Sequence, residues 1–246
     1  MTSSIPLPTG DSCLFLDVDG TLIEFSTNPS QTAATRALKD LLITVSDALD
    51  GAVALVSGRR IEDLDRIFFP LRLPAAGVHG GERRALPDLD PPNLPADIRL
   101  DPARDRLRQF CAQHPRVVLE DKSIAIAIHF RAEPAAATAL EQSLRTILTE
   151  LGPGFHALHG SMVVEIKPRG FTKARAIEEF LRQPPFRNRT PIFLGDDITD
   201  LDGFGLIEER HGTSIAVGDR VAAQWRLADP AAAREWLSEF AAMSTP

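Results

Sequence analysis

The sequence predicts an α/β protein built on a mainly parallel sheet, with a smaller α+β module inserted into it. Short apolar runs end in turns rich in Gly, Ser and Asp at residues 14–22, 52–59 and 191–200, as buried parallel strands do. Helical periodicity alternates with these runs in the first and last thirds of the chain. Between residues 85 and 166 the order becomes helix, two strands, helix, two strands, which is typical of a separate inserted module.

The first predicted strand lies in the stretch LFLDVDGTL at residues 14–22. Residues two apart on a strand point to the same side, so Asp17 and Asp19 are expected to project together from its carboxyl end. Gly20 and Thr21 then form a turn whose backbone N–H groups can surround an anion. One carboxylate can attack a substrate while the other moves protons. An acidic loop that caps a helix would give a similar pattern.

Helix and strand alternate through the rest of the first third, with a helix at 38–49, a strand at 52–56, a helix at 61–68 and a strand at 75–78. Ser57 follows the second strand, where its hydroxyl and a neighbouring N–H could hold a phosphate oxygen. Ser57 could equally be the N-cap of the helix at 61–68. His79, in a Gly-rich turn, lies at the site mouth or is a hydrogen-bonded structural residue.

The composition changes after residue 85, where a segment rich in proline and acidic residues reads as a linker. The module that follows is predicted to contain helices at 103–113 and 134–151 and strands at 117–120, 124–130, 154–158 and 162–166. This places a core at residues 1–84 and 167–246, and an α/β cap domain at residues 85–166.

The last third returns to the parallel-sheet pattern, with a helix at 172–181, strands at 191–194 and 213–217, and a closing helix at 230–240. Lys173 stands in the first turn of its helix, against the helix dipole, which would suit a bound anion there. A solvated surface lysine is the alternative.

Asp196, Asp197 and Asp200 follow a strand, and two such charges ~4 Å apart repel by about 4 kcal/mol. Mg²⁺ would relieve this repulsion, although an acidic N-cap explains part of the run.

Composition restricts the class of partner and the location. The chain has 246 residues, 43% hydrophobic and 25% charged, and a net charge of −7 from 34 acidic and 27 basic residues. The charge argues against binding nucleic acid or an anionic membrane. Two cysteines, Cys13 and Cys111, give no disulfide framework or metal spacing and suit a reducing compartment. No signal peptide or membrane-spanning run is visible, so we expect a cytoplasmic monomer acting on a small molecule.

The ordered set DVDGT, SGR, a lysine at a helix start and GDDITD resembles the haloacid dehalogenase (HAD) superfamily over nearly the whole chain. Within it, the sequence is similar to the trehalose-6-phosphate phosphatase family. The similarity rests on GVHGGE at residues 77–82, HFR at 129–131, VVEIKPRG at 163–170, GDDITD at 195–200 and WRLAD at 225–229. Two departures are Leu201, where the family has glutamate, and HFR in place of HYR.

The resemblance implies a HAD-like Rossmannoid core with a C2-type cap and a role for each matching residue. Asp17 would be the nucleophile and Asp19 the general acid and base, while Ser57 and Lys173 hold the phosphoryl group. Mg²⁺ would bind Asp17, Asp19 through its backbone carbonyl, and Asp196, supported by Asp197 or Asp200. The substrate-binding candidates are Gly20, Thr21, Gly58, Arg59, His79, Glu120, Lys122, Arg131, Glu165 and Lys167. Of those in the cap, the resemblance favours Glu120, Lys122 and Glu165, and solvated strand residues are the alternative.

The activity that the resemblance implies is Mg²⁺-dependent hydrolysis of trehalose 6-phosphate to trehalose and phosphate through an aspartyl-phosphate, as a step in trehalose biosynthesis. Phosphatases for sucrose, glucosylglycerol or mannosylglycerate phosphate share the same core motifs. A sugar-phosphate mutase would use the same nucleophile. A non-catalytic sensor is the remaining alternative, but it has no use for Asp17 beside a proton shuttle at Asp19.

Overall fold

The computed structural model describes residues 5–25, 32–86, 97–160 and 162–244. Its contacts divide the chain into two compact units, which we call the core unit (Met1–Pro92 with Thr172–Pro246) and the inserted unit (Asn93–Phe171). The inserted unit interrupts the core in sequence, and each unit has its own hydrophobic core. The predicted class, α/β with an inserted α+β module, is confirmed.

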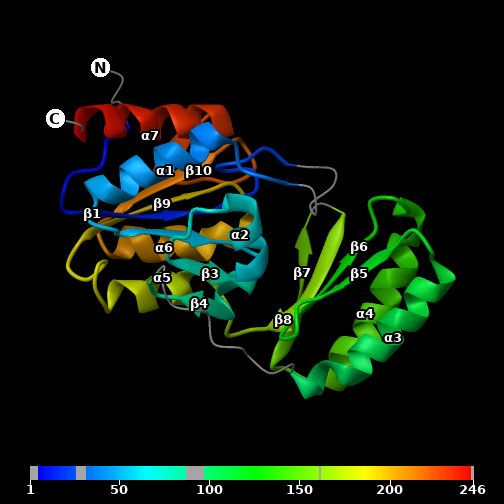
Figure 1. The fold of residues 1–246 in the computed structure, drawn as a ribbon. Helices are drawn as coiled ribbons and strands as arrows, with labels where there is room; N and C mark the ends of the chain where they lie inside the picture. Colours follow the sequence, from blue (N-terminus) through cyan, green and yellow to red (C-terminus); the bar gives the residue numbers. More distant parts are fainter. Residues whose placement is uncertain (1–4, 26–31, 87–96, 161, 245–246) are drawn as a thin grey trace. The chain divides into compact units, whose positions relative to one another are not determined.

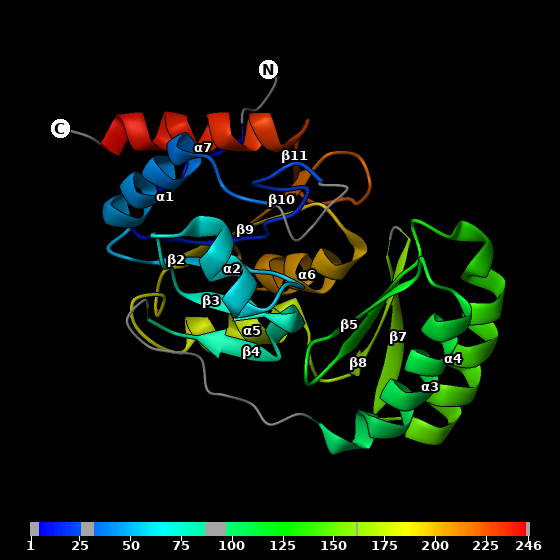
Figure 2. The same cartoon turned by 45° about the vertical axis from the view of Figure 1, so that its right-hand side comes forward.

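The core unit is built on a seven-stranded sheet in the order β11-β10-β9-β1-β2-β3-β4, in which only the β3–β4 pair is antiparallel. Helices α1 and α7 cover one face, and α5 and α6 cover the other (Figures 1 and 2). The strands are β1 (Ser12–Leu16), β2 (Val53–Val56), β3 (Ala75–Gly77), β4 (Glu82–Arg84), β9 (Thr190–Gly195), β10 (Thr213–Val217) and β11 (Trp225–Leu227). The helices are α1 (Arg36–Ala48), α2 (Ile61–Phe68), α5 (Lys173–Leu181), α6 (Leu201–Glu209) and α7 (Pro230–Ser244).

Burial on both faces explains why the central strands are continuously apolar. Every residue of β1 and β2 is buried, as expected for parallel strands covered by helices on each side. On α1, Leu38, Leu42 and Val45 recur at helical spacing and face this core. The Thr35 side chain caps the same helix by accepting a hydrogen bond from the Leu38 N–H at 3.2 Å.

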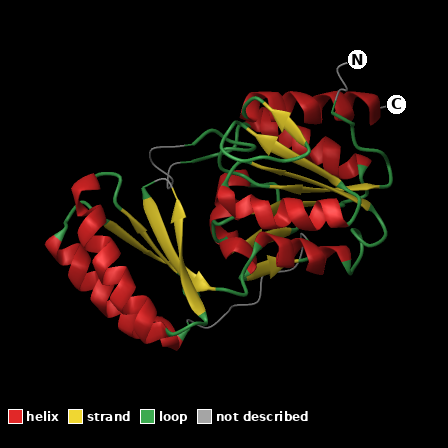
Figure 3. Ribbon diagram, turned by 180° about the vertical axis from the view of Figure 1, so that it is seen from behind, coloured by secondary structure: helices red, strands yellow, loops and turns green. Residues whose placement is uncertain are grey.

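The inserted unit is a four-stranded antiparallel sheet in the order β5-β6-β8-β7. Figure 3 shows both of its helices on one face of this sheet. The elements are α3 (Asp101–Gln113), β5 (Val118–Asp121), β6 (Ile126–His129), α4 (Ala137–Leu151), β7 (Phe155–Gly160) and β8 (Val163–Pro168). Ile126, Ile128, Val164 and Ile166 pack under the helices, so the alternate residues, including Glu120 and Glu165, point to the other face.

Two strands that the sequence did not predict are β4 and β11. Each has only three residues, ERR and WRL, without the apolar run that marks the central strands. They stand at the two edges of the core sheet, where packing on neighbours decides strand formation. Of the predicted linker at residues 87–97, all but Asp97 lies outside the described residues. None of the described helices is both long and apolar enough to span a bilayer.

Candidate active site

Three adjacent parallel strands deliver polar side chains to one edge of the core sheet. β1 lies between β2 and β9, and the three strands run directly into Asp17, Ser57 and Asp196. The Asp17 N–H donates to the Leu194 carbonyl at 3.0 Å, which ties the end of β1 to β9. The carboxyl edge of an open α/β sheet is where such folds bind ligands.

Lys173 reaches this edge from the start of α5. Its ammonium lies 2.7 Å from Asp17 Oδ1 and 2.6 Å from Asp200 Oδ1, and its side chain is 2% exposed. The alternative of a solvated surface lysine is therefore wrong. Phe180 on the same helix packs against Phe15 of β1, with ring centroids 6.0 Å apart, so the helix that carries Lys173 is fixed to the strand that carries Asp17.

Asp17, Asp196 and Asp200 form a buried carboxylate cluster in which one oxygen from each lies within 4.8 Å of the others. Burial, followed by the charges of Asp17 and Asp200, raises the pKa of Asp196 to about 8. Burial also raises the pKa of Asp200 to about 7, although the Lys173 charge opposes this rise. Burial would lower the pKa of Lys173, but Asp17 and Asp200 outweigh it and hold that pKa well above its ordinary value. The cluster has more negative charge than Lys173 offsets.

This donor set fits a hard divalent cation. All three side chains offer only oxygen, and the cluster contains no imidazole or thiolate among the described residues. Oxygen-only sites favour Mg²⁺ or Ca²⁺ over zinc. A cation here would supply the positive charge that the three buried carboxylates lack.

Asp197 and Asp200 of the GDDITD motif also make structural contacts with the backbone. Asp197 is the N-cap of a short 3₁₀ helix at Ile198–Asp200, and Asp200 Oδ2 accepts from the Asp196 and Asp197 N–H groups at 3.1 and 3.0 Å. The capping interpretation of this run is thus confirmed for Asp197, whose carboxylate is not part of the buried cluster. At Gly195 a β-carbon would overlap the Asp200 side chain, so glycine is required for this close approach.

The nucleophile candidate is oriented at both of its oxygens. Thr21 Oγ1 donates to Asp17 Oδ2 at 3.1 Å, while Lys173 binds Asp17 Oδ1. Thr21 is fully buried and Asp17 nearly so. Sequence reasoning placed Thr21 among the substrate-binding residues; the structure gives its hydroxyl a contact with the nucleophile candidate instead.

Asp19 is held by Arg59. Nε and Nη2 of Arg59 lie 2.6 and 2.7 Å from the two oxygens of Asp19, which is a bidentate ion pair. Arg59 Nη2 also donates to Thr32 Oγ1 at 3.4 Å. The structure therefore places this substrate-binding candidate on the proton-shuttle candidate, with one guanidinium hydrogen bond to each Asp19 oxygen.

A strained turn supports the Ser57 loop. The His79 N–H donates to the Ser57 carbonyl at 3.0 Å, and the Val78 N–H donates to the Arg59 carbonyl at 2.9 Å. Val78 and His79 have φ of 49° and 52°, which is costly for a β-branched residue. A β-carbon at Gly58 would lie 2.7 Å from His79 Nε2, so the buried imidazole packs directly on Gly58. This environment suits the structural alternative for His79.

Helix α2 does not use Ser57 as its N-cap. Its N-cap is Arg60, which makes no side-chain capping bond, and the Ile61 N–H donates instead to Glu82 Oε2 at 2.8 Å. The Ser57 hydroxyl accepts from the Arg59 N–H at 3.2 Å and is nearly buried. Glu82, which the sequence reasoning did not assign, thus anchors the start of α2 from the end of the GVHGGE motif.

The predicted sugar-binding residues of the cap lie in the inserted unit. Glu120 and Glu165 are both in register with Ala127 and therefore share one face of the sheet. Lys122 Nζ lies 2.8 Å from Glu165 Oε2, and His129 Nε2 lies 2.8 Å from Glu120 Oε2. Burial would raise the pKa of Glu120, but the His129 hydrogen bond and the Lys122 charge outweigh it and lower that pKa. These are polar and charged groups held in pairs, which suits recognition of hydroxyl groups.

The two other cap candidates differ in exposure. Lys167 Nζ donates to the Phe171 carbonyl at 2.8 Å and is largely buried. Arg131 follows β6 and is exposed. The structure thus places Glu120, Lys122, Glu165, Lys167 and Arg131 in one unit, while the carboxylate cluster belongs to the other.

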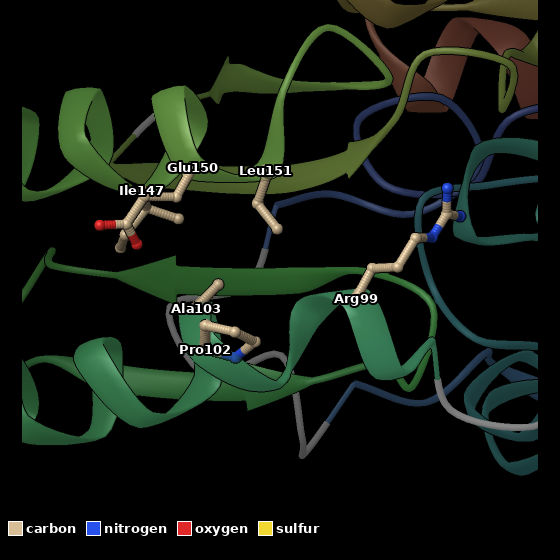
Figure 4. A pocket seen from close by; sticks show the side chains of 6 residues that line it. All are labelled: Arg99, Pro102, Ala103, Ile147, Glu150 and Leu151. Atoms are coloured by element: carbon tan, nitrogen blue, oxygen red, sulfur yellow. The ribbon is translucent and has the colours of Figure 1, made fainter.

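A small pocket in the inserted unit is not a candidate for chemistry. It is about 200 Å³ in volume and lies between α3 and α4 (Figure 4). Its lining consists of Arg99, Pro102, Ala103, Ile147, Glu150 and Leu151. Ligand sites are usually larger, roughly 300–1,000 Å³, and this lining contains no nucleophile or paired acids.

The raised pKa values predict how stability depends on pH without a metal ion. An unfolded aspartate loses its proton near 3.8, whereas Asp196 in the folded protein keeps it until about 8. The folded state therefore binds more protons across this interval, and stability falls as the pH rises through it. In EDTA, we expect the Tm of the wild type to fall from pH 5 to pH 8 more steeply than that of Asp196→Asn, which lacks this group. Equal slopes for the two proteins would contradict the raised pKa of Asp196.

Comparisons with known proteins agree with this geometry. The family model described as trehalose-phosphatase matches residues 15–232. The chain is 40% identical over 227 residues to the trehalose-6-phosphate phosphatase of Escherichia coli strain K12, covering 91% of this chain and 84% of that protein. It is 39% identical over 210 residues to a probable trehalose-phosphate phosphatase of Sinorhizobium fredii, covering 85% and 79%.

Solved structures share the fold at low sequence identity. The C-terminal domain of trehalose-6-phosphate phosphatase from C. albicans superposes with a TM-score of 0.82 at 20% identity, covering 95% of this chain and 93% of that one. A haloacid dehalogenase-like hydrolase from Bacteroides thetaiotaomicron gives 0.68 at 15% identity, covering 93% and 98%. Both matches extend over the core unit and the inserted unit, and the second places the fold in the haloacid dehalogenase-like class.

Proposed function

We infer that this chain, which belongs to the trehalose-phosphatase family, hydrolyses trehalose 6-phosphate to trehalose and phosphate. The observation that carries the proposal is the environment of Asp17: a buried carboxylate fixed by Thr21 and Lys173 beside two further buried carboxylates. A structural aspartate has no need of this arrangement. A nucleophile that must approach an anionic phosphate does need positive charge beside it, which Lys173 supplies and which a divalent cation held by the neighbouring carboxylates would increase.

In the first step, an Asp17 oxygen attacks phosphorus while the bond from phosphorus to the sugar 6-oxygen breaks, which leaves an aspartyl-phosphate. Asp19 gives its proton to the departing sugar oxygen. In the second step, Asp19 takes a proton from water, the water oxygen attacks phosphorus, and the bond to Asp17 breaks. Arg59, which binds both oxygens of Asp19, would orient this carboxyl for the transfers.

Three groups hold the transferring phosphoryl group. Lys173 is already charged and aimed at Asp17, and Ser57 follows the adjacent strand β2. The third is the turn at Gly20 and Thr21, whose N–H groups donate to the Ile23 and Val18 carbonyls at 2.7 and 3.4 Å in the structure and would have to leave these partners to bind phosphate oxygens. Mg²⁺, held by Asp17, Asp196, Asp200 and the backbone carbonyl of Asp19, would offset the negative charge of the phosphate. Asp197 would support Asp196 from its capping position.

The charged face of the inserted unit would bind the sugar hydroxyls. Carboxylates accept hydrogen bonds from hydroxyls, and ammonium groups donate to them. Glu120, Lys122 and Glu165 supply both kinds of group in fixed pairs. Arg131 and Lys167 would add positive charge for the phosphate, whereas the buried His79 would support the Ser57 loop from below Gly58. In this proposal the inserted unit is the cap domain that excludes water during the first step.

The test is phosphate release from a panel of sugar phosphates with and without Mg²⁺. We expect trehalose 6-phosphate to have the highest kcat/KM and turnover to require a divalent cation. Comparable turnover of sucrose, glucosylglycerol or mannosylglycerate phosphates would remove the narrow assignment and leave a phosphatase. Transfer of labelled phosphate back to a sugar would indicate a mutase, and binding without turnover would indicate a sensor.

We further propose that the protein acts in the cytoplasm as a monomer. Both cysteines are free thiols, and burial raises the pKa of Cys13 to about 12, which keeps it unreactive. A single sedimentation species at the mass of one chain, independent of protein concentration, is the expected result. A stable dimer would contradict it.

A further inference from the structure

Arg220 is a cation at the carboxylate cluster that belongs to none of the sequence motifs. It lies in the loop between β10 and β11. Its Nη1 is 3.0 Å from Asp196 Oδ2, and its Nη2 is 3.0 Å from Asp197 Oδ1. The guanidinium also stacks on Phe25, with its central carbon 5.3 Å from the ring centroid. One arginine therefore bridges the two neighbouring acids of the GDDITD motif.

The two cations at the cluster divide the carboxylates between them. Among the described residues, Lys173 pairs with Asp17 and Asp200, whereas Arg220 pairs with Asp196. Without Arg220, Asp196 would face two other carboxylates with no ion pair of its own. An unpaired charge in such a site is strongly destabilising, so Arg220 compensates the cluster where Lys173 does not.

The partners in this ion pair differ in how firmly they are held. The Asp196 side chain is 3% exposed, and that of Arg220 is 37% exposed. A β-carbon at Gly20 would lie 2.5 Å from Asp196 Oδ2, so this carboxylate is seated against the Gly20 backbone independently of Arg220. Arg220 can swing into solvent, and Asp196 would keep its orientation. The main effect of Arg220 on a cation in the cluster is therefore its charge.

We propose that Arg220 is the exchangeable counter-cation of the metal site, pairing with Asp196 when no ion is bound and opposing ion binding through its own positive charge. The proposal rests on the metal site of the proposed function. A divalent ion on Asp196 would stand close to the guanidinium, and the two like charges repel. Arg220 thus stabilises the metal-free protein and lowers the affinity for the ion.

The test is titration calorimetry of Mg²⁺ into the full chain. We expect Arg220→Gln to bind Mg²⁺ about three- to tenfold more tightly than the wild type at low ionic strength, with a smaller difference at high salt. Arg220→Lys keeps the charge and should bind like the wild type. Arg226→Gln is the matched control, because Arg226 holds the same loop through the Gly218 and Val221 carbonyls without touching a carboxylate.

A second readout is the Tm in EDTA and in saturating Mg²⁺. Arg220→Gln should have a lower Tm in EDTA and a larger gain from Mg²⁺ than the wild type. Unchanged or weaker Mg²⁺ binding in Arg220→Gln, or the same change in Arg226→Gln, would overturn the proposal. A different result would show that the cluster is not the metal site: Asp196→Asn would then bind Mg²⁺ as well as the wild type does. That result would also overturn the proposal for Arg220.

Discussion

Asp17→Asn should lower kcat for trehalose 6-phosphate by on the order of 10⁴-fold or more while leaving the substrate Kd within a few-fold of the wild type. The amide keeps the size of the side chain, and its oxygen can still accept from Lys173, while its NH2 group can donate to the Thr21 hydroxyl, which donates to Asp17 in the wild type. It cannot form an aspartyl-phosphate, because its oxygen is a poor nucleophile. Single-turnover kinetics and calorimetric binding of substrate measure the two quantities separately.

The matched control for this variant is Asp11→Asn. Asp11 is exposed and directly precedes β1, at the opposite end of the strand that Asp17 follows. The same chemical change there should leave kcat and Tm unchanged. Retained turnover in Asp17→Asn would place the nucleophile elsewhere, and lost binding would mean that Asp17 only shapes the site.

Lys173→Met should lower both activity and stability. Removing a preorganised cation that offsets developing charge costs about 10²–10³-fold in kcat. In the metal-free protein, Asp17 and Asp200 would lose their shared cation inside a buried cluster, which costs about 3–5 kcal/mol in the free energy of unfolding. Denaturant unfolding in EDTA measures this loss, and Mg²⁺ should restore part of it.

The sign of the stability change distinguishes a lysine that pairs with buried carboxylates from a lysine without partners. A cation in the first turn of a helix opposes the helix dipole. If Lys173 had no partners, its removal would therefore stabilise α5 by about 0.3–1 kcal/mol. Arg175→Met supplies the control, because Arg175 is an exposed cation in the same turn and its ion pair with Glu179 is long, at 3.4 Å. Equal behaviour of the two variants would contradict the role given to Lys173.

The sequence was sufficient to predict the edge of the sheet where the polar groups meet. Apolar runs that end at Asp17, Ser57 and Asp196 identify buried strands, and the rules for parallel sheets bring their ends together. Helical periodicity located α5 and placed Lys173 in its first turn. These features depend on local pattern, which is why they could be read without a structure.

Contacts between distant residues could not be read in the same way. Arg59 binds Asp19 across 40 positions and Arg220 binds Asp196 across 24, and each arginine lies in a turn or loop where no periodicity fixes its direction. Thr21 could face a phosphate or Asp17 from the same turn. The capping of α2 by Glu82 depends on how β4 folds back beside β3, and a three-residue strand leaves no apolar signal.

The most direct test of the central claim is a search for the phosphorylated enzyme in Asp19→Asn with an aryl phosphate as substrate. An aryl alcohol leaves without needing a proton, but breakdown of the aspartyl-phosphate needs Asp19 as base. We predict a burst of released phenol equal to the enzyme concentration, with one phosphoryl group on the peptide that contains Asp17. Phenol release without a burst, or a phosphoryl group on another peptide, would contradict the account.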